Sequence, residues 1–127
     1  MSENVSSIRI VVVDDDQPLR EALESMLKAA GFRVAIFSSA EEYLASPERQ
    51  SASCLILDVR LPGMSGIELQ HLLRSMGDAI PIVFLTGHGG AAMREMVMKA
   101  GAFDFLTKPV RRDVLLERIW SAVAMVG

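Results

Sequence analysis

The sequence has few of the features that mark an extracellular, membrane-spanning or nucleic-acid-binding chain. Its 127 residues include one cysteine, so no internal disulfide can form, and a reducing compartment suits such a chain. No apolar stretch approaches the roughly 18 residues needed to span a bilayer, and residues 1–7 lack the pattern of a signal peptide. The formal net charge of −3 gives no general attraction to nucleic acid or anionic lipid. We therefore expect a cytoplasmic chain that binds neither nucleic acid nor membranes directly.

The composition is that of a folded domain. Half of the residues are hydrophobic and 23% are charged, and the chain has no repeat or low-complexity segment. A chain of this length buries about two thirds of the surface that it exposes when unfolded. We expect a polar tail over residues 1–7 and a single domain over residues 8–125.

Short apolar runs alternate with helical patterns along the whole chain. Strands are predicted at 8–13, 34–37, 54–57, 80–85 and 103–106. Helices are predicted from a cap at Asp16 or Gln17 to 31, from 39, over 65–76, over 91–100 and from 113, with a polar loop at 47–53. In the helix over 65–76 the side chains expected to face inward are Ile67, Leu72, Leu73 and Met76. The alternation predicts an α/β fold with a parallel sheet and helices on both faces.

Polar residues stand where the predicted strands end. Asp14 and Asp15 follow the first strand, Asp58 the third, Thr86 the fourth and Lys108 the fifth. Only the second strand ends without a comparable group. In parallel sheets ligands bind beyond the carboxyl ends of the strands, so we expect these five side chains to share one pocket.

The three carboxylates of this set point to a bound cation. Carboxylates that converge on one pocket repel one another and raise one another's pKa. A hard divalent cation relieves this repulsion, and Mg²⁺ prefers oxygen ligands. Zinc is disfavoured, since Cys54 lies in a strand and the two histidines, His71 and His88, lack ligand spacing.

The remaining two residues of the set suit a phosphoryl group. Lys108 and Thr86 are hydrogen-bond donors that can contact phosphoryl oxygens, and the lysine can share the phosphoryl charge with Mg²⁺. Asp58 is the best-placed nucleophile, because it leaves the central strand with no acidic neighbour, and an aspartate can accept a phosphoryl group covalently. The residues therefore predict a Mg²⁺-assisted aspartyl phosphate.

Four segments occur in order around these residues. They are Val12-Val-Asp14-Asp15, Leu57-Asp58-Val-Arg-Leu-Pro62-Gly63-Met-Ser-Gly66, Phe84-Leu-Thr86-Gly87-His88-Gly89 and Lys99-Ala-Gly-Ala-Phe-Asp-Phe105-Leu-Thr-Lys108-Pro109. Together they resemble the receiver domain of two-component response regulators, from residue 8 to about 125. The last two segments are most similar to the receivers of FixJ-type transcription regulators. The resemblance implies a doubly wound, flavodoxin-like (CheY-like) sheet with strand order 2-1-3-4-5 and five helices.

The resemblance also implies roles for the strand-end residues. Asp58 would accept phosphate from a sensor histidine kinase, and the chain would act as a switch rather than an enzyme, with only self-phosphorylation from small donors and slow self-hydrolysis. Asp15, Asp58 and the Arg60 carbonyl would hold Mg²⁺ directly, and Asp14 would assist, often through water. Thr86 and Lys108 would contact the phosphoryl oxygens.

Three further residue roles follow from the resemblance. Phe105 would be the switch aromatic, which we expect to move inward with the Thr86 loop on phosphorylation. The peptide bond between Lys108 and Pro109 would be cis. Arg60 and His88 occupy the positions that tune dephosphorylation in the family, and we expect these two bulky side chains to alter water access.

The output surface is expected on the last two helices. Their apolar residues exceed what one buried stripe needs, and methionine suits adaptable contacts. These residues are Met93, Met96, Val97, Met98, Leu116, Trp120 and Val123. We expect phosphorylation to remodel this face, which would contact a downstream protein, the chain's own output domain, or a second copy in a phosphorylation-dependent homodimer.

Two other functions are possible, and the sequence does not decide whether the chain is a whole protein or part of a longer regulator. A Mg²⁺-dependent phosphohydrolase could use Asp58, but such enzymes commonly need an acid two residues later, where Arg60 cannot serve. A receiver-fold scaffold would work without phosphorylation, although the complete site argues against it. The chain is either a stand-alone receiver or part of a regulator with a helix-turn-helix output domain, which FixJ-type relatives usually carry.

Overall fold

The architecture is a parallel sheet between two layers of helices. The computed structural model describes residues 7–126, except for the side chains of residues 125 and 126, so the predicted tail lies outside the described residues apart from Ser7. The strands run in the order β2-β1-β3-β4-β5 and all their pairings are parallel. Their bounds are β1 (Arg9–Val13), β2 (Arg33–Phe37), β3 (Cys54–Leu57), β4 (Ile82–Thr86) and β5 (Asp104–Thr107). The predicted fold class and strand order are confirmed.

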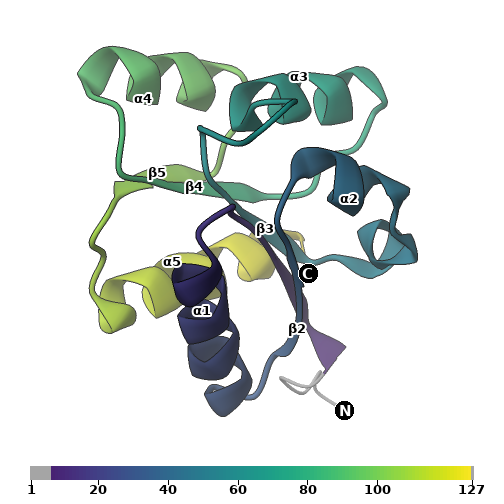
Figure 1. Cartoon of the computed structure of the whole chain (residues 1–127), viewed down its shortest axis with the longest axis vertical. Coiled ribbons are helices and arrows are strands. Elements are labelled where there is room, and N and C mark those ends of the chain that lie inside the picture. The colour runs from purple at the N-terminus through teal and green to yellow at the C-terminus, as the bar shows by residue number, and fades with distance from the viewer. Residues whose placement is uncertain (1–6, 127) are drawn as a thin grey trace.

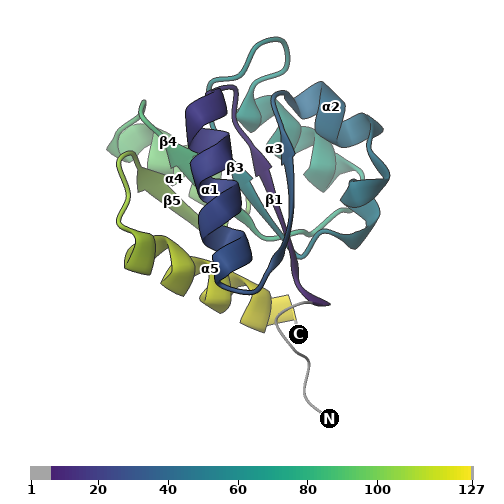
Figure 2. The same ribbon diagram turned by 60° about the horizontal axis from the view of Figure 1, so that its bottom comes forward.

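Helices cover both faces of this sheet. They are α1 (Gln17–Ala29), α2 (Ala40–Ala45), α3 (Gly66–Ser75), α4 (Ala91–Lys99) and α5 (Arg112–Val126), with a short 3₁₀ helix, η2 (Pro47–Ser51), after α2. Figures 1 and 2 show α1 and α5 on one side of the sheet and α2, α3 and α4 on the other. In the described residues, no helix is both long and apolar enough to cross a bilayer.

Alternation along the strands divides the core between the two layers. Val11 and Val13 of β1 join the cluster under α2, α3 and α4, whereas Ile10 and Val12 join the cluster under α1 and α5. Successive side chains of a strand point to opposite faces, so the unbroken apolar run of β1 supplies both clusters. The sheet is thus fixed from both faces, and only its ends remain available for polar chemistry.

The phase of α3 corrects one set of predicted inward residues. Ser65 and Glu68 form a capping box that starts the helix at Gly66. From this start the buried stripe comprises Gly66, Leu69, Gln70 and Leu73. Met76 follows the last helical residue and is 49% exposed, so its predicted inward position is wrong.

Other differences concern the ends of elements. Asp16, and not Gln17, caps α1, since its carboxylate accepts a hydrogen bond from the Leu19 amide at 3.3 Å. β4 and β5 each extend to the threonine beyond the predicted end. The predicted loop at 47–53 contains η2, which Ser46 starts by accepting a hydrogen bond from the Glu48 amide.

The predicted output face is partly exposed. On α4, Val97 is buried, Met93 and Met98 are half-buried and Met96 is exposed. On α5, Trp120 is exposed with its ring centroid 4.9 Å from that of Phe32. Most of the apolar residues predicted for the output face are therefore buried or half-buried, and Met96 and Trp120 are the two of that set that are exposed.

Candidate functional site

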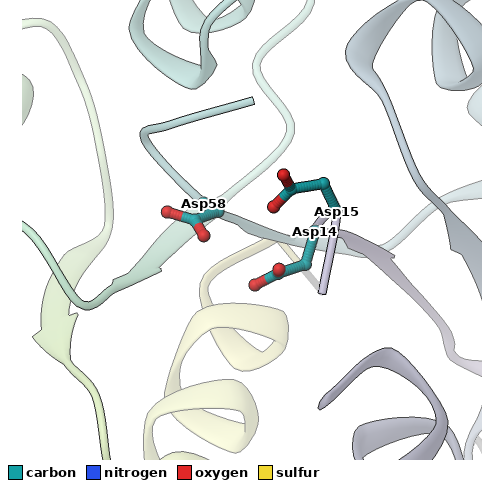
Figure 3. A group of neighbouring side chains, drawn as sticks. All are labelled: Asp14, Asp15 and Asp58. Carbon is teal, nitrogen blue, oxygen red and sulfur yellow. The ribbon is translucent and has the colours of Figure 1, made fainter. Parts of the chain in front are cut away.

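The carboxyl ends of β1, β3 and β5 deliver an acidic cluster and one lysine to a common point. Asp14 and Asp15 follow β1, Asp58 follows β3 and Lys108 follows β5. One carboxylate oxygen from each of Asp14, Asp15 and Asp58 can be chosen so that all lie within 4.8 Å of one another. Figure 3 shows these three carboxylates at the neighbouring ends of β1 and β3.

Lys108 joins the two buried carboxylates. Its Nζ donates hydrogen bonds to Asp14 Oδ2 at 2.8 Å and to Asp58 Oδ2 at 2.9 Å. Asp14 and Asp58 are 3% and 5% exposed, so these charges are largely removed from solvent. Burial disfavours the charged lysine, but its hydrogen bonds to the two carboxylates outweigh that effect and raise the pKa of Lys108.

The acids nevertheless remain in electrostatic conflict. Burial raises the pKa of Asp14, and the nearby Asp58 charge adds to the increase, although hydrogen bonds from Lys108 and the Asp16 amide oppose it. Asp15 is exposed, and within the described part of the chain its carboxylate makes no hydrogen bond or salt bridge. Two of the three carboxylates thus share the Lys108 ammonium, and the third has no cationic partner among the described residues.

A hard divalent cation fits this donor set. The cluster offers carboxylate oxygens, and among the described residues the Asp15 carboxylate has no competing hydrogen-bond or salt-bridge partner. Hard cations such as Mg²⁺ bind through one or two carboxylates plus water and phosphate oxygens. Asp14, Asp15 and Asp58 could therefore hold Mg²⁺ and lose their mutual repulsion.

The pocket above this cluster is open to solvent and small. Its volume is about 310 Å³, and its walls come from four loops that follow strands. The lining residues are Asp14, Asp15, Asp16, Asp58, Arg60, Gly87, His88 and Lys108. Arg60 and His88 therefore do line the pocket, where their side chains can influence water near Asp58.

Thr86 is not among the residues that line this pocket. It is the last residue of β4 and is fully buried, and its Oγ1 accepts a hydrogen bond from the His88 amide at 3.1 Å. The Lys108 amide donates to the Thr86 carbonyl at 2.8 Å, which fixes the two strand ends relative to each other. In this structure the Thr86 hydroxyl is therefore engaged with the backbone of the loop that follows β4.

Phe105 already points inward. Its side chain is 5% exposed and its ring centroid is 6.4 Å from that of Phe84. A Cβ atom on Gly89 would approach the Phe105 ring to 2.8 Å, so the ring lies directly under the loop after β4. The ring therefore already occupies the inward position that we expect it to reach on phosphorylation. The Lys108–Pro109 peptide bond that follows is cis.

Sequence reasoning missed several residues that hold the site. Glu41 of α2 accepts a hydrogen bond from the Met64 amide at 2.8 Å, in the loop that follows Asp58. Arg94 of α4 donates to the Phe105 carbonyl at 2.7 Å and forms a salt bridge with Asp104 at 3.2 Å. Neither contact follows a spacing rule, because each joins elements that only the tertiary fold brings together.

Comparison with known proteins identifies the same architecture. The family model described as the response regulator receiver domain matches residues 10–120. The response regulator protein TodT of Pseudomonas putida is 45% identical over 125 residues, which are 98% of this chain and 54% of TodT. The transcriptional regulatory protein FixJ of Bradyrhizobium diazoefficiens is 40% identical over 90% of this chain and 56% of FixJ. The chain therefore spans about half the length of these relatives.

Solved structures show a similar fold. The response regulator StyR superposes with a TM-score of 0.87 at 44% identity, over 94% of this chain and 61% of StyR. The structure named FixJ-N superposes with a TM-score of 0.83 at 38% identity, over 98% of this chain and 96% of that one.

Proposed function

The chain belongs to the family of response regulator receiver domains, and on that premise we propose that it is a phosphorylation-dependent switch with Asp58 as the phosphoacceptor. The observation that carries the proposal is the bridge from Lys108 to both Asp14 and Asp58 across the strand ends. A lysine held by two buried carboxylates beside a third acid is a poor structural element, because burying charges is costly. The same arrangement is well suited to receive a phosphoryl group.

The phosphoryl donor is the phosphohistidine of a sensor histidine kinase. A carboxylate oxygen of Asp58 forms a bond to phosphorus as the phosphorus–nitrogen bond of the donor breaks. The donor imidazole leaves in its neutral form, with its proton on the other ring nitrogen. The phosphorylated Asp58 no longer presents the same carboxylate to Lys108, so the ammonium is available to contact the phosphoryl oxygens.

The acidic cluster would hold the Mg²⁺ that this transfer requires. Asp15, Asp58 and the Arg60 carbonyl would be its direct ligands, and Asp14 would assist, in part through water. When bound, Mg²⁺ neutralises charge on the carboxylates and on the phosphoryl oxygens. Lys108 stays charged across the physiological range, because its pKa is raised, and supplies the second positive charge of the pocket.

The signal leaves the site through the loop after β4. Thr86 turns its hydroxyl toward the phosphoryl group, and this movement favours the inward position of Phe105 found here. The resulting population shift changes the surface formed by α4, β5 and α5. That surface then controls a downstream protein or the chain's own output domain, or joins two copies through α4 and α5. The switch domain covers residues 8–125 and works in the cytoplasm.

Two alternatives have less support. A phosphohydrolase would need a general acid near the leaving group, and two residues after Asp58 the chain has Arg60. A scaffold that works without phosphorylation would have no use for three acids and a lysine in one pocket. The chain's own chemistry is therefore limited to phosphotransfer, self-phosphorylation from small donors and slow self-hydrolysis.

Intact-mass measurement after incubation with Mg²⁺ and acetyl phosphate separates the three functions. We expect the mass of one phosphoryl group to appear on the wild-type protein and not on Asp58→Asn. Sustained turnover of small phosphoesters would favour the hydrolase instead. No mass increase and no turnover, in protein shown to be folded, would favour the scaffold.

A further inference from the structure

The loop between β3 and α3 is closed at its base. The Gly66 amide donates a hydrogen bond to the Val59 carbonyl at 2.8 Å, so the loop closes on itself just beyond the end of β3. A Cβ atom at Gly66 would overlap the backbone carbonyl of Asp58, which shows how closely the two segments lie. Inside this closure the Arg60 amide donates to Asp58 Oδ1 at 3.2 Å.

The far part of the same loop is held by a side chain from another element. Glu41 Oε2 accepts a hydrogen bond from the Met64 amide at 2.8 Å, across 23 residues of sequence. The neighbouring Gly63 has φ +71°, and a Cβ atom there would meet the Glu41 carboxylate. A glycine is therefore required both by the left-handed backbone and by the approach of this carboxylate.

Glu41 is itself held in a fixed place. It lies in the first turn of α2, which Ser39 caps by accepting a hydrogen bond from the Glu42 amide at 3.1 Å. The Glu42 carboxylate accepts from the Ser38 amide at 2.9 Å and so closes the same turn. The two adjacent glutamates thus have different tasks, because Glu42 fixes the start of α2 while Glu41 reaches the loop after Asp58.

We propose that Glu41 is a positioning residue for the Mg²⁺ site, acting through the β3–α3 loop. This inference rests on the proposed function, in which the Arg60 carbonyl is a metal ligand. Arg60 lies between the closed base at Val59 and the anchored residue Met64, so the hydrogen bond to Glu41 limits where its carbonyl can point. Glu41 is not part of the group of three acids that can hold the ion, so its effect comes through the backbone.

An NMR titration with Mg²⁺, followed at the amides of residues 58–60, tests this inference. We expect Glu41→Ala to weaken Mg²⁺ binding at least about 10-fold, as is typical when the groups that support metal ligands are lost. Glu41→Gln keeps an oxygen acceptor for the Met64 amide, so it should bind within about threefold of wild type. Glu42→Ala disturbs α2 but leaves the contact to the loop, so it should bind Mg²⁺ like wild type.

A second readout separates positioning from general stability. Amide hydrogen exchange at Met64, measured without Mg²⁺, should accelerate in Glu41→Ala and not in Glu42→Ala, while urea unfolding reports any global loss. Wild-type affinity in Glu41→Ala overturns the inference and leaves the proposed function intact. Equal weakening by Glu42→Ala also overturns it, since the cause would then be the stability of α2. No Mg²⁺ binding by the wild-type protein would contradict the proposed metal site itself.

Discussion

The two loops on either side of the Asp58 pocket differ in how firmly they are held. The β3–α3 loop is tied at its base by Gly66, in the middle by Glu41 and at its end by the Ser65–Glu68 capping box. The β4–α4 loop, residues 87–90, is exposed throughout. Within the described part of the chain, its hydrogen bonds are those of the His88 amide to Thr86 Oγ1 and of the Arg94 amide to the Gly90 carbonyl, and Gly90 caps α4 without a side-chain hydrogen bond.

This difference assigns different parts of the switch to the two loops. A segment with few hydrogen bonds and exposed backbone opens at low free-energy cost, whereas a segment tied at several points moves only with the fold. The β3–α3 loop suits a fixed metal site, and the β4–α4 loop suits the part that rearranges around a phosphoryl group. The following predictions test this division, from the largest expected effect to the smallest.

The largest effect is expected when a methyl group is added at Gly66 in the β3–α3 loop. Gly66→Ala would force a Cβ atom into the Asp58 carbonyl, and backbone cannot yield as a side chain can. We expect a loss of about 2–4 kcal/mol in the free energy of unfolding, measured in urea. The matched control is Gly87→Ala in the other loop, where a Cβ atom meets nothing within 4 Å and the change should stay within about 0.5 kcal/mol. Equal losses at the two positions would remove the distinction between the loops.

An effect of opposite sign is expected at Asp14. Burial and the Asp58 charge raise the pKa of this group, so its ionised form destabilises the folded chain. Asp14→Asn should therefore unfold at a higher urea concentration than wild type at pH 7 without Mg²⁺. Because the folded pKa is raised, this advantage should vanish as pH falls below the ordinary aspartate pKa, where both side chains are neutral in both states. An advantage that persists at low pH would show that charge is not its cause.

A smaller loss is expected when α4 is released from β5. Arg94→Ala removes the hydrogen bond to the Phe105 carbonyl and the salt bridge to Asp104. Because the arginine side chain is half exposed, we expect a loss of about 1 kcal/mol together with faster amide exchange in α4. Glu95→Ala, which breaks only the exposed pair with Lys99, is the control and should change little. Unchanged exchange in Arg94→Ala would mean that other contacts hold α4.

The smallest effects are expected at the pocket rim. Arg60→Ala and His88→Ala remove bulk beside Asp58 without touching Lys108, so water should reach the acyl phosphate more easily. Each substitution should speed the decay of phosphorylated protein by a few-fold, which intact-mass measurements over time can follow. Decay at the wild-type rate in both variants would refute the tuning role of these side chains.

Part of this arrangement can be predicted from the sequence. Every strand except the second is a short apolar run that leads into a polar residue, so the meeting of Asp14, Asp58 and Lys108 at one edge of the sheet follows from local patterns. The order of the strands does not, because it is expected only from the resemblance to receiver domains. The buried face of α3 does not, because the capping box at Ser65 sets its phase and leaves Met76 outside. The contact between Glu41 and Met64 also has no local signal, since it depends on how α2 packs beside the loop.

The most direct test of the central claim compares the two loops in one experiment. Backbone amide chemical shifts are measured with Mg²⁺ alone and then with Mg²⁺ and beryllium trifluoride, which mimics the phosphoryl group. The difference should be large for residues 86–90, Phe105 and α4, and small for residues 63–66. Large chemical-shift changes in residues 63–66, with none in the β4–α4 loop, would contradict the account. In that account the β3–α3 loop is a fixed part of the metal site and the β4–α4 loop rearranges around the phosphoryl group.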